Sequence, residues 1–221
     1  MGFKLRGDLS YCEVSDRLVF LDLPSDRYFC LSPRLEAGFR AAVAGIPDVA
    51  PAIEIAPLLN AGLLMPTRGP ELPTPCILPQ PPRASFLDER PAPARPIAVG
   101  VLAAGIALSR LALRIGRFHQ AIARLAERKA AIGNRHAPPD DAMRDLAAQF
   151  ERTGEITQVH DRCLPRSLAL ASYAVRRGWP VDLVLAVQLR PFAAHCWVQA
   201  GAHLLNDRID TVRPFTPILV V

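Results

Sequence analysis

The sequence lacks most of the features that mark a secreted protein. Its five cysteines are an odd number, and no two of them form a CxxC pair. This pattern argues against a disulfide framework and favours a reducing compartment. The start of the chain also lacks an apolar signal region. We therefore expect a cytoplasmic protein.

Long apolar runs and glycine-rich phosphate loops are missing as well. The candidate run, residues 97–109, has 13 residues, whereas a membrane-spanning helix needs about 20. We predict a buried helix there and no membrane span. Because no Gly-rich loop is present to cradle phosphates, the residues themselves indicate no cofactor. We also expect no nucleic-acid partner.

Aromatic residues are few, at 6%, but 50% hydrophobic and 21% charged residues are typical of a globular protein rather than a disordered one. The net charge of +5 is unevenly placed, because residues 97–135 hold seven basic side chains against one acid, Glu127. By 3.6-residue spacing, one helical face holds Arg110, Arg114, Arg117, Arg124 and Arg128. This face is either simply solvated or a docking surface for an acidic peptide, a partner protein or a lipid.

The 22 prolines divide the chain. Nine of them fall within residues 69–96, where they forbid a continuous helix or a central strand. Such a segment is extended and fairly stiff, so we predict a linker over 69–96. It separates an N-terminal domain, residues 1–68, from a C-terminal domain, residues 97–221.

The N-terminal domain has the pattern of a small sheet backed by helices. Runs rich in aromatic and branched residues predict three hairpin-linked strands, at 11–14, 17–23 and 27–31. Helical composition follows at 35–44 and again at 49–64, where two prolines predict two short helices. Three strands followed by three helices are typical of a winged-helix-like module.

The C-terminal domain has helical patterns followed by strand patterns, which indicates an α+β fold. The predicted helices cover 97–132, 140–150 and 163–177, and the predicted strands cover 181–189, 194–200, 203–207 and 216–221. The last helix begins at Cys163, where a polar segment turns into a run rich in alanine and leucine.

Cys163 therefore stands at a helix start, where unpaired backbone N–H groups and the helix dipole stabilise a thiolate. Alternation along 194–200 puts His195 and Trp197 on one face of the strand and Cys196 on the other. Since free cysteine is among the most buried residue types, we expect Cys196 to be a core residue.

A turn at residues 201–202 brings the next strand beside His195, so that Asp207 can accept a hydrogen bond from the imidazole. The pattern proposes Cys163 as nucleophile, His195 as its base and Asp207 as the group that orients the base. Asp210 is a second candidate for the orienting role. A thiol at a helix start with His and Asp on adjacent strands is the papain-like and transglutaminase-like arrangement.

A zinc site is the alternative, because His160, Cys163, His195 and Cys196 are all possible ligands. Adjacent residues on a strand point to opposite faces, however, so His195 and Cys196 cannot both reach one ion without a bulge. We therefore predict no metal.

Three segments resemble the transglutaminase-like leader peptidase of lasso-peptide biosynthesis, the microcin-processing B protein family. They are RCLPRSLAL at 162–170, HCWV at 195–198 and Asn206-Asp207, and the resemblance covers 140–221. Residues 1–68, with YFCLSP at 28–33, are similar to the PqqD-like peptide-recognition module fused to that peptidase. The family usually has a small residue where Cys196 stands and commonly an acid where Gln199 stands.

This resemblance implies a cysteine peptidase that removes the leader from a ribosomally made precursor peptide and frees the core's N-terminus. A separate cyclase, similar to asparagine synthetase, would then join that amine to an acidic side chain. The resemblance also implies a possible ATP dependence, which would belong to the cyclase.

The resemblance further implies that the leader binds as an added strand at a sheet edge, with apolar anchors in a groove between strand and helix. The peptide-binding residues expected from this layout are Arg27, Tyr28, Phe29, Cys30, Leu31, Ile55, Leu58 and Leu59. Two other functions stay open. The chain could be a non-catalytic chaperone that delivers the precursor to another enzyme, or a transglutaminase-like acyltransferase.

Overall fold

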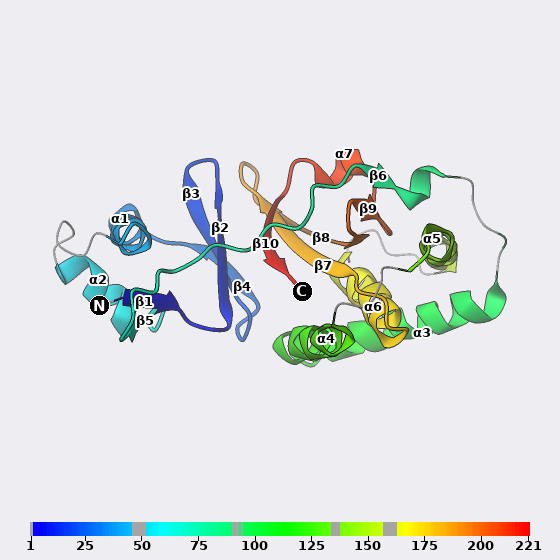
Figure 1. Ribbon diagram of the computed structural model, residues 1–221, viewed down its shortest axis with the longest axis horizontal. Helices are drawn as coiled ribbons and strands as arrows, with labels where there is room; N and C mark the ends of the chain where they lie inside the picture. Colours follow the sequence, from blue (N-terminus) through cyan, green and yellow to red (C-terminus); the bar gives the residue numbers. More distant parts are fainter. Residues whose placement is uncertain (1, 46–51, 90–92, 94, 134–137, 157–162) are drawn as a thin grey trace. The chain divides into compact units, whose positions relative to one another are not determined.

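The computed structural model describes residues 2–45, 52–89, 93, 95–133, 138–156 and 163–221. They form two compact units, Met1–Ile77 and Leu78–Val221, which are described separately (Figure 1). The division falls inside the proline-rich segment 69–96, so this segment contributes residues to both units.

The first unit contains an antiparallel three-stranded sheet. Its strands follow chain order and are β2 (Leu9–Val14), β3 (Arg17–Asp22) and β4 (Arg27–Cys30). The turn between β2 and β3 places Ser15 and Asp16 at positive φ, 47° and 66°, as a two-residue hairpin turn requires. These are the three strands that the sequence predicts.

The helices of this unit differ from the prediction. Helix α1 (Pro33–Val43) begins with proline at its first position and ends before Gly45, as expected. Within 49–64, however, the described residues form one helix, α2 (Ala52–Asn60), and Leu64 begins a strand. That strand, β5 (Leu64–Thr67), pairs with β1 (Gly2–Leu5), a pairing that sequence reasoning missed. The region is strand-rich, and a winged-helix-like module is not confirmed.

Aromatic rings form the centre of the first core. Phe20 of β3 lies between Phe29 of β4, stacked at 5.3 Å, and Tyr11 of β2, stacked at 5.6 Å. Phe39 of α1 meets both Phe20 and Tyr11 edge-on at 5.0 Å. Because aromatic pairs favour these two geometries, they fix α1 on one face of the sheet.

A buried carboxylate joins α1 to the sheet. Glu36 is 5% exposed and accepts hydrogen bonds from Arg17 Nε (2.9 Å), Arg40 Nη2 (2.9 Å) and the Leu18 N–H (3.1 Å). Burial by itself raises the pKa of Glu36, but the Arg17, Arg40 and Leu18 donors outweigh it and hold the pKa below its usual 4.5. The stabilisation is thus present above pH 4.5 and is lost as the pH falls through the lowered pKa.

Replacing Glu36 with glutamine should lower the free energy of unfolding by about 1–3 kcal/mol at pH 7, because two guanidinium groups lose their shared charge partner. The partners are each about 40% exposed, which limits the loss. Glu13→Gln is the matched control: Glu13 pairs with the same Arg40 but is 54% exposed, so its loss should stay below about 1 kcal/mol. Urea unfolding followed by circular dichroism measures both, and equal losses would refute the role of burial.

The second unit is built on a five-stranded sheet in the order β10-β7-β8-β9-β6. Its strands are β6 (Ala84–Ser85), β7 (Asp182–Gln188), β8 (Ala193–Ala200), β9 (His203–Leu204) and β10 (Thr216–Val220). All pairs are antiparallel except β6 with β9. The mixed α+β layout agrees with the sequence prediction, although β9 is shorter than predicted and β6 comes from the predicted linker.

The described part of this unit also contains helices. They are α3 (Pro96–Arg114), α4 (Phe118–Ile132), α5 (Asp140–Ile156), α6 (Cys163–Arg176) and the short α7 (Ile209–Val212). Helix α6 packs on β7 and β8, and α3 packs on α5 and α6 (Figure 1). Gly116, at φ 72°, separates α3 from α4. The five arginines predicted on one helical face therefore belong to two helices and the joint between them.

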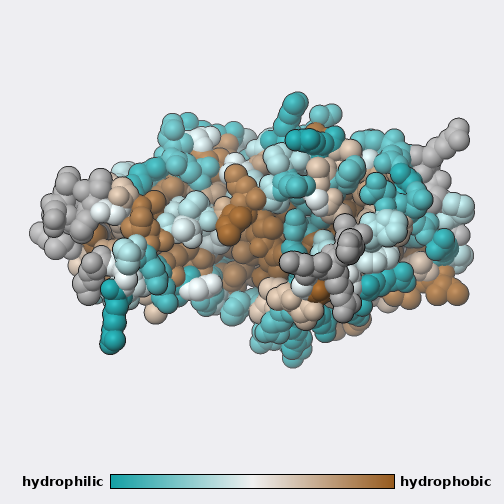
Figure 2. Space-filling model, in the orientation of Figure 1, coloured by the Kyte–Doolittle hydropathy of each residue, from teal (hydrophilic) through white to brown (hydrophobic). Residues whose placement is uncertain are grey.

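Helix α3 is mostly exposed, so the prediction of a buried helix is wrong for most of its surface. Only Val99, Leu102 and Ile106 are buried, whereas Ile97 and Leu108 are 85% and 66% exposed. Figure 2 shows hydrophobic residues at the surface over the first half of α3. Among the described helices α3 alone is long and apolar enough to cross a membrane, with 19 residues and mean hydropathy 1.9. Its buried face packs on α5 and α6.

Candidate active site

Cys163 is the first residue of α6, as the sequence predicts. Pro165 fits the first turn because the N–H groups there have no partner within the helix. From Ser167 to Ala171 every side chain is buried, which holds this end of the helix against the sheet. Cys163 itself is half-buried. A thiol in this position is accessible and lies at the positive end of the helix dipole.

His195 meets both of its predicted partners. Its Nε2 lies 2.5 Å from Asp207 Oδ2, and the imidazole also hydrogen-bonds to the Cys163 thiol. Strand alternation separates it from Cys196, which is 3% exposed, as predicted for a core residue. The structure thus brings Cys163, His195 and Asp207 into one hydrogen-bonded row.

The environment of His195 favours the protonated imidazole. Burial by itself lowers the pKa of His195, but the hydrogen bonds and charges of Asp207 and Cys163 outweigh it and raise the pKa from 6.5 to about 9. The imidazole beside Cys163 is therefore protonated at neutral pH and can act as a proton donor. The row can therefore provide a nucleophile and a proton donor together.

The turn after β8 positions Asp207. Gly201 adopts φ 57° in the predicted two-residue turn, and β9 then ends at Leu204, three residues before the carboxylate. Asp207 Oδ1 accepts the Arg208 N–H at 2.8 Å, and the Asp207 carbonyl accepts the Ser85 hydroxyl at 2.6 Å. These bonds leave Oδ2 directed at His195. The carboxylate that contacts the imidazole is thus Asp207, not the alternative Asp210.

A polar network ties the row to α6. Asn206 Oδ1 accepts the Val198 N–H at 2.7 Å, and Asn206 Nδ2 donates to Ser167 Oγ at 2.8 Å. Ser167 Oγ in turn donates to the Cys196 carbonyl at 2.8 Å. Sequence reasoning missed the roles of Ser85, Ser167 and Asn206. Only Asn206 had a signal, its place beside Asp207.

The zinc alternative gains no support. His160 lies outside the described residues, and among the described ones no three His, Cys, Asp or Glu side chains gather as a metal site. His195 is already bonded to Asp207 and Cys163. Burial raises the pKa of the Cys196 thiol well above 9, which disfavours the thiolate that a metal needs.

The predicted leader-binding residues fall into two groups. Strand β4 is the last strand of its sheet, with Arg27 and Cys30 exposed and Tyr28 and Phe29 half-buried. By contrast, Leu31, Ile55 and Leu58 are buried in the core, and Leu59 is half-buried beside it. Among the described residues no strand pairs with the outer edge of β4, whereas Leu31, Ile55 and Leu58 pack into the core.

At the opposite edge of that sheet, β2 is already bonded to the following segment. The Cys76 N–H donates to the Tyr11 carbonyl at 2.9 Å, and the Tyr11 hydroxyl donates to the Pro73 carbonyl at 3.2 Å. A leader that binds as an added strand is therefore expected at the outer edge of β4 rather than at β2.

The fold and the row define a class of protein. An α+β unit with a thiol at a helix start, facing an imidazole and a carboxylate from the sheet, has the transglutaminase-like arrangement. Residues 105–220, more than half of the chain, match the transglutaminase-like superfamily. The chain belongs to this superfamily. Searches of curated proteins and of solved structures found no match.

Proposed function

We propose that this chain is a cysteine peptidase that removes the leader from a lasso-peptide precursor, a B protein of that biosynthesis. The hydrogen-bonded row of Cys163, His195 and Asp207 carries the proposal. Membership of the transglutaminase-like superfamily, which includes cysteine peptidases and acyltransferases, supports it at the level of chemistry. The lasso-peptide role rests on the resemblance of residues 162–170, 195–198 and 206–207.

In the proposed reaction, the thiol proton of Cys163 has already passed to His195, and the resulting thiolate attacks the carbonyl carbon of the leader's last residue. The Cys163 backbone N–H, which has no partner within the helix, stabilises the oxyanion. Collapse of this intermediate breaks the peptide bond while imidazolium donates its proton to the leaving amine. Water, deprotonated by His195, then hydrolyses the thioester and releases the leader as a carboxylic acid. Asp207 orients the imidazole throughout.

The N-terminal unit would hold the substrate. We propose that residues 1–68 act as a PqqD-like module and bind the leader along β4, whose outer edge ends the sheet. The proline-rich segment 69–96, which joins the two units, then converts leader binding into a high local concentration of the scissile bond at Cys163. An asparagine-synthetase-like cyclase would take up the freed core in the cytoplasm.

Acyl transfer is the second candidate, because the superfamily includes acyltransferases. In that reaction a second amine, rather than water, attacks the thioester. The two functions share every residue of the row and differ only in the group that receives the acyl chain.

Incubating the full chain with a candidate precursor in ¹⁸O-labelled water tests the proposal. The precursor is the product of a short reading frame beside this gene, tried with and without the neighbouring cyclase and ATP. Hydrolysis should yield a core with a free N-terminus and a leader carboxylate that contains one ¹⁸O atom. A new amide without ¹⁸O would favour acyl transfer. An intact precursor under all conditions would refute both reactions for that substrate.

A further inference from the structure

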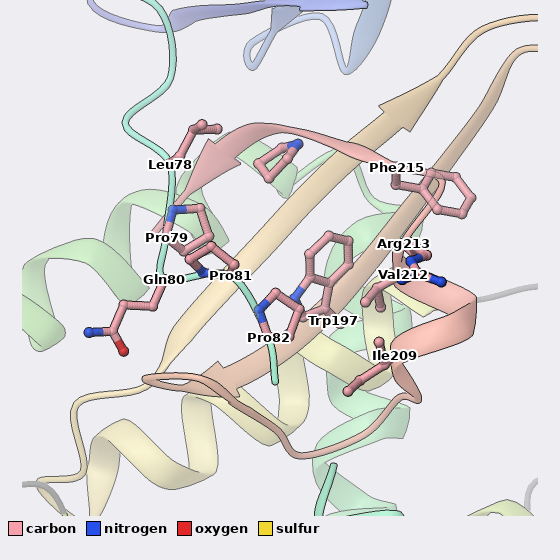
Figure 3. Close-up of a pocket in the computed structure, with 11 residues that line it drawn as sticks. Leu78, Pro79, Gln80, Pro81, Pro82, Trp197, Ile209, Val212, Arg213 and Phe215 are labelled. Atoms are coloured by element: carbon pink, nitrogen blue, oxygen red, sulfur yellow. The ribbon is translucent and has the colours of Figure 1, made fainter. Parts of the chain in front are cut away.

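An apolar pocket lies wholly within the second unit (Figure 3). Residues 78–82, which include three prolines, form one wall. Trp197 of β8, Ile209 and Val212 of α7, and Phe215 form the opposite wall, and Arg213 also lines the pocket. The cavity volume is about 360 Å³, within the range of ligand-binding pockets.

Two of the rings that line the pocket lie near His195. The Phe215 ring lies 5.1 Å from the imidazole, and the Trp197 ring lies 6.1 Å from it, measured between ring centroids. Both rings also line the pocket. A group bound in the pocket therefore lies one aromatic ring away from the imidazole.

A buried glutamine holds the pocket in shape. Gln199 is fully buried; its Oε1 accepts the Trp197 indole N–H at 2.9 Å, and its Nε2 donates to the Gln80 carbonyl at 2.8 Å. One amide thus fixes both the indole of one wall and the proline-rich segment of the other. These two bonds preorganise the pocket, which lowers the entropic cost of binding a side chain there.

The proton that His195 donates indicates which half of the cleaved peptide lies beside the pocket. His195 must donate a proton to the leaving amine, and this amine belongs to the residue that follows the cleaved bond. The chain after the cleaved bond therefore starts next to the imidazole, beside Phe215 and Trp197. Proline and aromatic rings favour an apolar or aromatic side chain as their partner.

We propose that this pocket is a subsite for an apolar or aromatic side chain of the peptide segment that follows the cleaved bond. The inference rests on the proposed peptidase function and adds a substrate preference to it. Trp197, Ile209 and Phe215 are the residues that determine the preference.

Kinetics with a filled pocket test the subsite. Ile209→Trp places a larger ring in the cavity, and Thr211→Trp is the matched control, because Thr211 lies on the same short helix but is exposed and outside the pocket. In the precursor, each residue after the cleaved bond is replaced in turn with alanine. For the wild type and Thr211→Trp, replacing one apolar residue should raise KM roughly tenfold or more.

For Ile209→Trp, replacing the same precursor residue with alanine should leave KM unchanged. The introduced tryptophan already fills the pocket, so that even the unaltered precursor binds without it. If no position matters, or if Ile209→Trp shows the same preference as the wild type, the subsite is refuted. Either result leaves the peptidase function intact, provided that cleavage still depends on Cys163.

A binding measurement separates the subsite from the peptidase reaction. The chain has two tryptophans, so 5-fluorotryptophan labelling gives two ¹⁹F resonances, which Trp179→Phe assigns. Titrating glycyl-phenylalanine amide, which mimics the leaving half, should shift the Trp197 resonance and not that of Trp179, whereas glycyl-aspartate amide should shift neither. If the Trp197 resonance shifts but the chain cleaves no peptide, the pocket binds the apolar side chain as proposed and the peptidase function is refuted. Cleavage without a Trp197 shift up to the solubility limit would refute the subsite alone.

Discussion

Replacing Cys163 with alanine should abolish cleavage of the precursor, with a fall in kcat/KM of at least about 10⁴-fold, because the row then lacks the thiol that forms the thioester. Leader binding should be unchanged, since the proposed binding edge is β4 of the other unit. Cleavage is measured by mass spectrometry and binding by fluorescence anisotropy of a labelled leader. The same variant should accumulate as a stable complex with the uncut precursor.

Cys76→Ala is the control for this experiment. Cys76 is also a half-buried thiol, but it lies in the first unit. Its replacement should leave the cleavage rate at the wild-type value. Full cleavage by Cys163→Ala would end the cysteine-peptidase proposal, and loss of leader binding in that variant would show that Cys163 acts on the fold instead.

Replacing Asp207 with asparagine should lower the cleavage rate roughly 10²–10⁴-fold, because the imidazole loses the charge that orients and stabilises its protonated form. The pH profile adds a sharper readout. In the wild type the protonated His195 persists until the pH rises through about 9, so the rate should fall above that pH. In Asp207→Asn the pKa of His195 moves back towards its ordinary 6.5, and the fall should begin at a lower pH.

The same raised pKa has a consequence for stability. The pairing of His195 with Asp207 stabilises the fold fully below pH 6.5, and this contribution is lost as the pH rises through about 9.

Asp210→Asn is the control for the cleavage experiment with Asp207→Asn. Asp210 is exposed on α7 and is not the carboxylate bonded to His195. If both variants lose activity equally, or if the basic limb of the profile stays near pH 9 in Asp207→Asn, Asp207 does not have the proposed role.

The row itself was predictable from local signals. Cys163 begins a helix because a polar segment meets a run of good helix formers, and Pro165 fits only the first turn. His195 and Asp207 lie close in sequence, so a single two-residue turn suffices to join them. Each of these features depends on fewer than about 15 neighbouring residues, which is the range over which periodicity and turn chemistry act.

Features that depend on distant residues were not predictable in this way. Ser85 bonds to the Asp207 carbonyl across 122 positions of sequence, and β1 pairs with β5 across about 60. No periodic pattern marks such partners in advance. The exposure of α3 was also missed, because an apolar run indicates which side chains favour burial but not whether another element covers them.

By itself, then, the sequence determined a thiol at a helix start, an imidazole on a strand and a carboxylate after a short turn, because helix starts and strand alternation are local properties of the chain. Only the tertiary structure decided that Asp207 rather than Asp210 contacts His195, and that residues 78–82 close a pocket against Trp197 and Phe215. Both depend on which surfaces pack together once the sheet and its helices assemble, and packing is a property of the whole fold.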